Sequence, residues 1–138
     1  MKVLITGASG QLGKRIIDSA PSSVELLSPS KSNLNLENFL LCKNYILDKN
    51  PDWIINCAAY TNVDKAEKER TLAYKINCLA PNALVEALNQ TNGNILQIST
   101  DYVFDGQQGF PYKEDDTKNP INNYGYSKAI CEEYIKTN

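Results

Sequence analysis

A glycine-rich loop near the N-terminus limits the fold more than any other part of the sequence. Residues 7–13 read GASGQLG and follow an apolar, β-branched run over residues 2–6, which predicts a buried strand. Residues 11–20 then show a helical pattern that Pro21 ends. A strand, a G-x-x-G-x-x-G loop and a helix in direct succession indicate the first half of a βαβ unit.

Each glycine of this loop has a separate task in a dinucleotide-binding turn. Gly7 permits the tight turn, Gly10 lets the backbone approach a pyrophosphate, and Gly13 lets the helix pack close to the sheet. The pyrophosphate then binds the free N–H groups of the helix N-terminus. An ordinary glycine-containing turn is the competing interpretation, but the position between a first strand and its helix favours dinucleotide binding.

Strand and helix patterns alternate along the rest of the chain. Further strands are expected over residues 24–28, 52–56 and 94–99, and helices over 36–49, about 64–90 and from Asn122 or Asn123 to the end. Pro81 is expected to kink the second of these helices or to mark a joint in it. This order predicts an α/β fold with a Rossmann-type doubly wound parallel sheet, which we expect in the strand order 3-2-1-4.

Composition argues against several classes of function. The 138 residues carry 14 basic and 16 acidic side chains, a formal charge of −2 and no histidine. The charge balance argues against nucleic-acid binding, and the missing histidine excludes Ser-His-Asp and Cys-His catalysis within the chain. The four cysteines form no CxxC pair, so no metal site is expected. No signal peptide or membrane-spanning run is visible, and we expect a cytoplasmic protein without membrane contact.

The residues after the second strand bear on the choice of cofactor. The acid that binds the ribose of NAD is missing from residues 27–31, which read LSPSK. Small hydroxyls such as that of Ser28, with Lys31 nearby, can instead accept a 2′-phosphate, which favours NADP. The alternative, in which Lys31 is an ordinary solvated lysine, stays open, and with it the use of NAD.

A second group of residues, near the C-terminus, is suited to acid–base chemistry. Tyr124 and Lys128 are four residues apart and share one face of the last helix. An ammonium near a phenol favours the phenolate, so a tyrosine can act as acid or base in a chain without histidine. Thr100, just beyond the fourth strand, is placed to hydrogen-bond a substrate carbonyl. Chance Y-x-x-x-K pairs occur in helices, but the combination with Thr100 and the glycine loop favours catalysis. Tyr126 is a weaker candidate, because it faces elsewhere.

Five segments together resemble one family. They are GASGQLG (7–13), NCAAYTNVDKAE (56–67), ISTDYVFDG (98–106), YKEDD (112–116) and NPINNYGYSK (119–128). Over the whole chain they are similar, in register, to the dTDP-4-dehydrorhamnose reductases, the RmlD-like branch of the extended short-chain dehydrogenases/reductases. The resemblance implies a nucleotide-sugar substrate and NAD(P)H-dependent reduction of dTDP-4-dehydro-L-rhamnose to dTDP-L-rhamnose.

The resemblance also implies roles for individual residues. Together with the glycine loop and the segment after the second strand, it gives these predicted cofactor-binding residues: Gly7, Gly10, Gln11, Leu12, Gly13, Ser28, Lys31, Asn35, Leu36, Ala59, Tyr60, Thr61, Ser99, Tyr124 and Lys128. Thr100, Asp101 and Tyr102 are expected to bind the sugar nucleotide. Tyr124 would donate the proton, Lys128 would hold the ribose, and Thr100 would complete the catalytic group. Ser28 and Asn35 stand where family members often carry acids.

The length of the chain leaves alternatives open. The chain ends ten residues after Lys128, whereas family members continue much further. We therefore expect residues 1–138 to form the cofactor-binding domain with its catalytic residues, without the later strands and the substrate domain. The strand over 94–99 would then be an exposed edge through which the chain self-associates or forms a homo-oligomer. The alternatives are an NADP-binding partner subunit, similar to the regulatory subunit of methionine adenosyltransferase, and a sugar-nucleotide epimerase or dehydratase.

Overall fold

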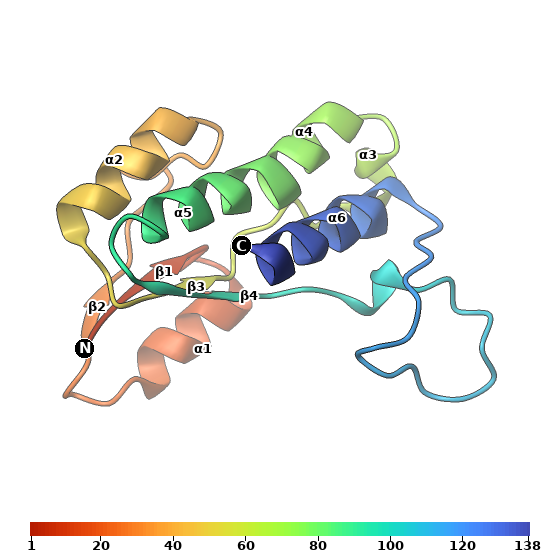
Figure 1. Cartoon of the computed structure of the whole chain (residues 1–138), viewed down its shortest axis with the longest axis horizontal. Helices are drawn as coiled ribbons and strands as arrows, with labels where there is room; N and C mark the ends of the chain where they lie inside the picture. Colours follow the sequence, from red (N-terminus) through yellow and green to blue (C-terminus); the bar gives the residue numbers. More distant parts are fainter.

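Four parallel strands form the central sheet of the computed structural model, which describes residues 1–138 (Figure 1). They are β1 (Lys2–Thr6), β2 (Glu25–Leu27), β3 (Trp53–Asn56) and β4 (Asn94–Gln97). The register pairs Leu4 with Leu27 on one side and with Ile54 on the other, and Ile54 in turn with Ile95. The predicted doubly wound parallel fold is confirmed.

The predicted strand order is wrong. The strands follow one another as β2-β1-β3-β4, so β3 lies between β1 and β4 and not outside β2. A physical reason is visible in the strands themselves. β2 has only three residues, begins with the exposed Glu25 and buries no side chain fully, which suits an edge. β3 carries the fully buried Ile54 and Asn56 and is therefore suited to the interior of the sheet.

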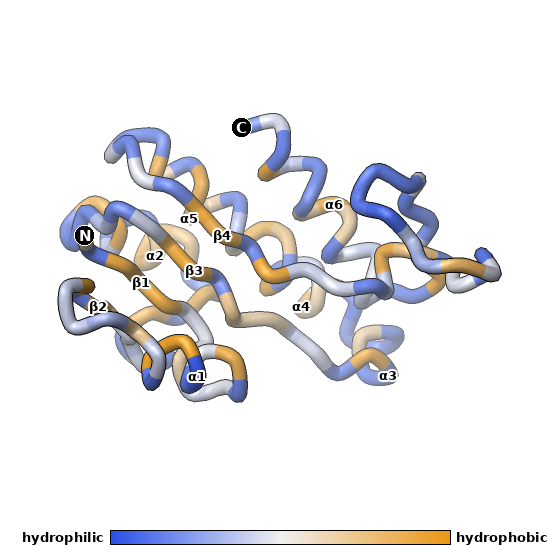
Figure 2. The backbone as a smooth tube through the Cα atoms, turned by 90° about the horizontal axis from the view of Figure 1, so that it is seen from below, coloured by the Kyte–Doolittle hydropathy of each residue, from blue (hydrophilic) through white to orange (hydrophobic).

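The helices cover the two faces of the sheet unequally (Figure 1). Helix α1 (Gln11–Ser19) lies on one face, and α2 (Phe39–Lys49), α5 (Ala80–Leu88) and α6 (Asn123–Thr137) lie on the other. The main core lies between the sheet and the second group of helices, where Leu4 and Ile54 pack with Ile46, Leu84 and Leu88. Figure 2 shows the matching hydrophobic stretches along β1, β3 and β4.

The helical stretch expected over about 64–90 is divided into shorter pieces. These are α3 (Val63–Ala66), α4 (Arg70–Tyr74), the π-helical turn η1 (Lys75–Leu79) and α5. The N–H of Ala80 bonds to the carbonyl of Lys75, five residues earlier, directly before Pro81, which has no N–H to donate. The joint predicted at Pro81 is therefore confirmed, and it takes the form of a π-turn.

The long segment between β4 and α6 is mostly irregular. It contains a single 3-10 turn, η2 (Asp101–Val103), and ends at Asn122, whose side chain caps α6 by accepting a hydrogen bond from the N–H of Gly125 at 2.7 Å. All four cysteines are free, and Cys42, Cys78 and Cys131 are buried. None of the helices combines the length and the hydropathy that crossing a bilayer requires. No cluster of acidic, cysteine or histidine side chains could hold a metal ion.

Candidate functional site

The glycine loop joins β1 to α1 through very close backbone contacts. Gly7 has φ +65°, and a Cβ atom there would lie 2.6 Å from the nitrogen of Ala58. At Gly13 a Cβ atom would lie 2.8 Å from the Cα of Ala8, so only glycine lets the helix approach the loop. Gly10 is the N-cap of α1 and offers no side chain, which leaves the N–H groups of the first turn free for an anion.

A groove of about 850 Å³ runs along this loop at the carboxyl ends of β1 and β2. Most of the predicted cofactor-binding residues line it: Gly7, Gly10, Gln11, Leu12, Gly13, Ser28, Lys31, Asn35, Leu36, Ala59 and Thr61. Three segments far apart in sequence meet there: the glycine loop, the segment after β2 and the segment after β3. Ligands of doubly wound sheets bind at this edge, where the strands end.

Buried polar side chains tie the strand ends together beneath the groove. The hydroxyl of Thr6 on β1 donates to the side-chain oxygen of Asn56 on β3, and both residues are buried. The amide of Asn56 donates to Gln97 on β4 at 2.7 Å. These bonds hold β1, β3 and β4 in one register at their carboxyl ends, which gives the floor of the groove a fixed shape.

Tyr60 is the first predicted site residue whose side chain the structure does not bring to the groove. Its hydroxyl donates to Glu69 Oε2 at 2.6 Å, and this hydrogen bond to a carboxylate raises the pKa of Tyr60 to about 12. Its main chain lies between Ala59 and Thr61, which both line the groove. The N–H donates to Asn77 Oδ1 at 2.7 Å, and the carbonyl accepts from Asn77 Nδ2 at 3.0 Å.

Asn77 connects the segment after β3 to helix α6 and was not predicted from the sequence. It lies in the π-turn η1, is almost fully buried, and also donates from Nδ2 to Ser127 Oγ at 3.0 Å. Ser127 in turn donates to the carbonyl of Tyr124 at 2.7 Å. A continuous chain of hydrogen bonds therefore runs from Tyr60 to the first turn of α6. The only available sequence signal was a polar residue on an otherwise apolar helical face.

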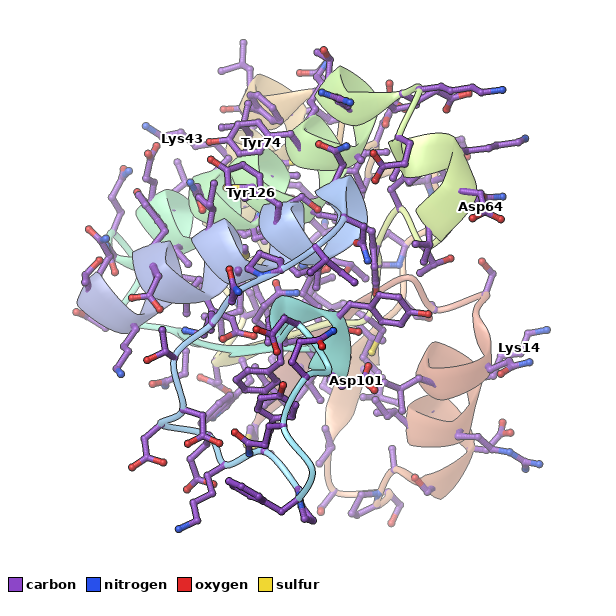
Figure 3. The ribbon with its side chains drawn as sticks, turned by 90° about the vertical axis from the view of Figure 1, so that its right-hand side faces the viewer. Lys14, Lys43, Asp64, Tyr74, Asp101 and Tyr126 are labelled. Atoms are coloured by element: carbon purple, nitrogen blue, oxygen red, sulfur yellow. The ribbon has the colours of Figure 1, made fainter.

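Helix α6 brings Tyr124 and Lys128 to the end of β4. Gly125 allows this approach, because a Cβ atom there would clash with the carbonyl of Tyr102. The rings of Tyr102 and Tyr124 meet edge to face with centroids 5.7 Å apart. Figure 3 shows Tyr126 beside Tyr74, on the side of α6 away from Asp101, so Tyr126 faces elsewhere, as predicted.

Lys128 is a buried cation at the carboxyl end of β4. It is 3% exposed, and its Nζ donates to the carbonyl of Ile98 at 2.5 Å. Burial lowers the pKa of Lys128 below the usual lysine value. Thr100 lies two residues beyond that carbonyl, where its hydroxyl accepts from the N–H of Tyr102 at 3.3 Å and caps η2. The three predicted catalytic residues therefore come from neighbouring parts of the fold: Thr100 caps η2, and Tyr124 and Lys128 lie on α6, which packs against η2.

Ser99 does not turn its side chain toward the groove. Its hydroxyl donates to Glu132 on α6, and the second oxygen of Glu132 lies 3.1 Å from Lys118 Nζ. The N-terminus of α6 is held separately by Glu67, which accepts from the N–H of Asn123 at 2.8 Å and from its amide at 2.5 Å. Glu67 and Glu132 were not predicted, and both fix α6 against the rest of the fold.

The fold and the groove define a doubly wound α/β domain with a glycine loop of the dinucleotide-binding type. The family model described as the RmlD substrate binding domain matches residues 1–138, and the chain belongs to this family. It is 42% identical over 140 residues to a dTDP-4-dehydrorhamnose reductase of Aggregatibacter actinomycetemcomitans. That match covers 99% of this chain and 47% of the relative. The chain thus spans about half the length of the curated relatives it matches.

Two solved structures show the same likeness in three dimensions. A dTDP-4-dehydrorhamnose reductase from Clostridium acetobutylicum superposes with a TM-score of 0.96 at 43% identity, over 99% of this chain and 49% of that one. A dTDP-4-dehydrorhamnose reductase from Bacillus anthracis, solved in complex with NADP, gives a TM-score of 0.94 at 39% identity, with the same coverage of both chains.

Proposed function

We propose that residues 1–138 form the cofactor-binding domain of an NADP-preferring dTDP-4-dehydrorhamnose reductase that produces dTDP-L-rhamnose. One observation carries this proposal: the glycine-loop groove and the Tyr124–Lys128 turn of α6 lie at the same carboxyl edge of the sheet. The NADP bound in the Bacillus anthracis relative and the reductase names of the relatives support it. Free cysteines are compatible with the cytoplasmic location that we propose with it.

The residues of the groove fit a dinucleotide. The backbone at Gly7 and Gly13 has no room for a Cβ atom, and the first turn of α1 has no side-chain cap, which together favour a pyrophosphate at Gly10, Gln11 and Leu12. Ser28 and Lys31 lie at the end of the groove after β2 and would take the 2′-phosphate of NADP. When bound, the cofactor supplies the hydride.

The proton then comes from the chain itself. In the proposed reaction the hydride reaches C4 of the sugar, and the Tyr124 hydroxyl donates its proton to the carbonyl oxygen, which becomes a hydroxyl. Thr100 hydrogen-bonds the same oxygen and polarises it. The ammonium of Lys128 stabilises the phenolate that remains on Tyr124 and holds the ribose of the cofactor.

The test compares two tyrosine variants in the protein that carries this domain. We expect Tyr124→Phe to lower the rate of NADPH oxidation with dTDP-4-dehydro-L-rhamnose by about 10²- to 10⁴-fold, because the proton donor is removed. Tyr126→Phe is the matched control, since it removes a hydroxyl from the same helix on its other side. Equal turnover in both variants would contradict the role of Tyr124. NADPH binding without any turnover of the wild type would instead favour a non-catalytic, cofactor-binding subunit.

A further inference from the structure

The segment after β2 places a carboxylate at the end of the groove where Rossmann-type folds read the ribose. Lys31 and Glu37 both line the groove, and Lys31 Nζ lies 3.2 Å from Glu37 Oε1. Ser30 and Ser32 hydrogen-bond each other through their hydroxyls at 2.7 Å. The residues at this position decide between a ribose hydroxyl and a 2′-phosphate in this class of fold. Glu37 therefore places a negative charge beside the lysine that would bind the 2′-phosphate.

The two members of this ion pair are anchored very differently. The N–H of Glu37 donates to Asn35 Oδ1 at 3.0 Å, and the neighbouring Leu34 and Leu36 are buried in the main core. The backbone that carries the carboxylate is therefore fixed. The Lys31 side chain is 77% exposed, compared with 34% for Glu37, and has no other partner in the structure. The lysine is therefore the more exposed member of the pair, whereas the carboxylate is attached to a fixed backbone and is half-buried.

The two charges act in opposite directions on the ligand. A phosphate monoester carries close to two negative charges near neutral pH, so the Glu37 carboxylate repels it and the Lys31 ammonium attracts it. A ribose hydroxyl, in contrast, can donate a hydrogen bond to a carboxylate. To hold a 2′-phosphate, Lys31 must leave Glu37 or share its charge between two anions.

We infer that the Lys31–Glu37 ion pair sets the choice between NADP and NAD in this groove. Lys31 favours the 2′-phosphate, and Glu37 limits that preference and makes NAD acceptable. The inference rests on the proposed function, because it requires that the groove bind a dinucleotide. It assigns a specificity role to Glu37, a residue outside the glycine loop and outside the catalytic group.

Direct binding measurements on the 138-residue chain test the inference without any assay of turnover. The affinities of NADPH and NADH are measured by fluorescence titration, and those of 2′,5′-ADP and 5′-ADP by calorimetry, which isolates the 2′-phosphate. We expect Glu37→Gln to raise the NADPH-to-NADH affinity ratio by about threefold to fivefold, as is usual for one exposed charge pair. Lys31→Gln should lower the ratio by a similar factor. Both effects should shrink in high salt, because the pair is exposed.

Two variants with the same change of charge serve as controls. Glu25→Gln removes an acid at the opposite end of β2, where it faces Lys2 at 3.9 Å, and Lys43→Gln removes an exposed lysine from α2. Neither residue lines the groove, and neither variant should change the ratio. If Glu37→Gln changes the ratio no more than Glu25→Gln does, the ion pair has no part in selectivity, although the groove still binds its cofactor. If the wild type binds neither dinucleotide, the proposed function fails as well.

Discussion

Among single residues, Gly13 gives the sharpest test of the loop geometry. We expect Gly13→Ala to destabilise the fold by about 1–3 kcal/mol, because the added methyl group meets the backbone of Gly7 and Ala8. The same crowding should push α1 away from the loop and weaken NADPH binding. Urea denaturation and fluorescence titration measure the two effects.

Gly109→Ala is the matched control, since a Cβ atom at Gly109 would meet nothing within 4 Å. Its free energy of unfolding and its affinity for NADPH should stay close to those of the wild type. A Gly13→Ala protein that is as stable as this control would show that α1 can move away from the loop at no cost.

Single residues of the site differ in whether the sequence alone could predict them. Gly7 and Gly13 could be predicted because their task depends on neighbours in the same loop. Asn77 and Glu67 could not, because their partners Ser127 and Asn123 are 50 and 56 residues away. A polar residue whose partner comes from a distant element has no local pattern, and its role becomes visible only when the helices are packed.

At the scale of helices and strands, the residue ranges of the strands could be predicted from the sequence, but the pairing of the strands in the sheet could not. Each strand lies inside its predicted range, since runs of apolar and β-branched residues mark strands locally. The order of the strands depends on which side of β1 the connection through α2 returns, and no local pattern encodes that choice. The π-turn was likewise indicated only by Pro81, which marks a break without specifying its hydrogen bonds.

The irregular segment between η2 and α6 depends on one carboxylate for its shape. Asp105 accepts hydrogen bonds from Tyr112 at 2.6 Å, from the N–H of Gln107 at 2.9 Å and from Asn119 at 2.9 Å. These bonds, with that from Tyr112 the largest, lower the pKa of Asp105 from 3.8 to about 2. Phe104 stacks on the Tyr112 ring, with centroids 4.4 Å apart. The segment is therefore an ordered loop.

A pH dependence follows from this depressed pKa. Because the folded protein holds the carboxylate more strongly ionised than the unfolded chain does, its contribution is complete above about pH 4 and is lost as the pH falls toward 2. We expect Asp105→Asn to reduce the acid-dependent fall in the urea midpoint between pH 5 and pH 2. Asp115→Asn, in the same segment, is the control. An unchanged slope for Asp105→Asn would show that the loop does not depend on this ionisation.

At the scale of the whole domain, one edge of the sheet and part of one of its faces are not covered by other elements. Strand β4 is an edge of the sheet, as predicted, and its Leu96 is 49% exposed. Trp53 on β3, which is 39% exposed, lies on the same face of the sheet, the face that carries only α1 (Figure 1). An unpaired edge beside exposed apolar side chains favours association.

We therefore propose that the isolated chain self-associates through β4. Sedimentation velocity over a range of concentrations should show dimers or larger species, and Leu96→Lys should shift them toward monomer, because a charge on an edge strand opposes pairing. Leu40→Lys is the control, since Leu40 is 69% exposed on α2, far from that edge. A wild-type chain that stays monomeric at high concentration would contradict the proposal.

The place of β1 between β2 and β3 also has a consequence for synthesis on the ribosome. β1 pairs with Trp53–Asn56, about 50 residues later in the chain, through a register that begins at Val3 and Trp53. The apolar side chains of β1 are therefore made early but cannot pair on that side until β3 has left the exit tunnel. The sheet can therefore complete its folding only after β3 has been synthesised. A pause in translation before β3 would prolong the time during which the apolar side chains of β1 are exposed to other nascent chains.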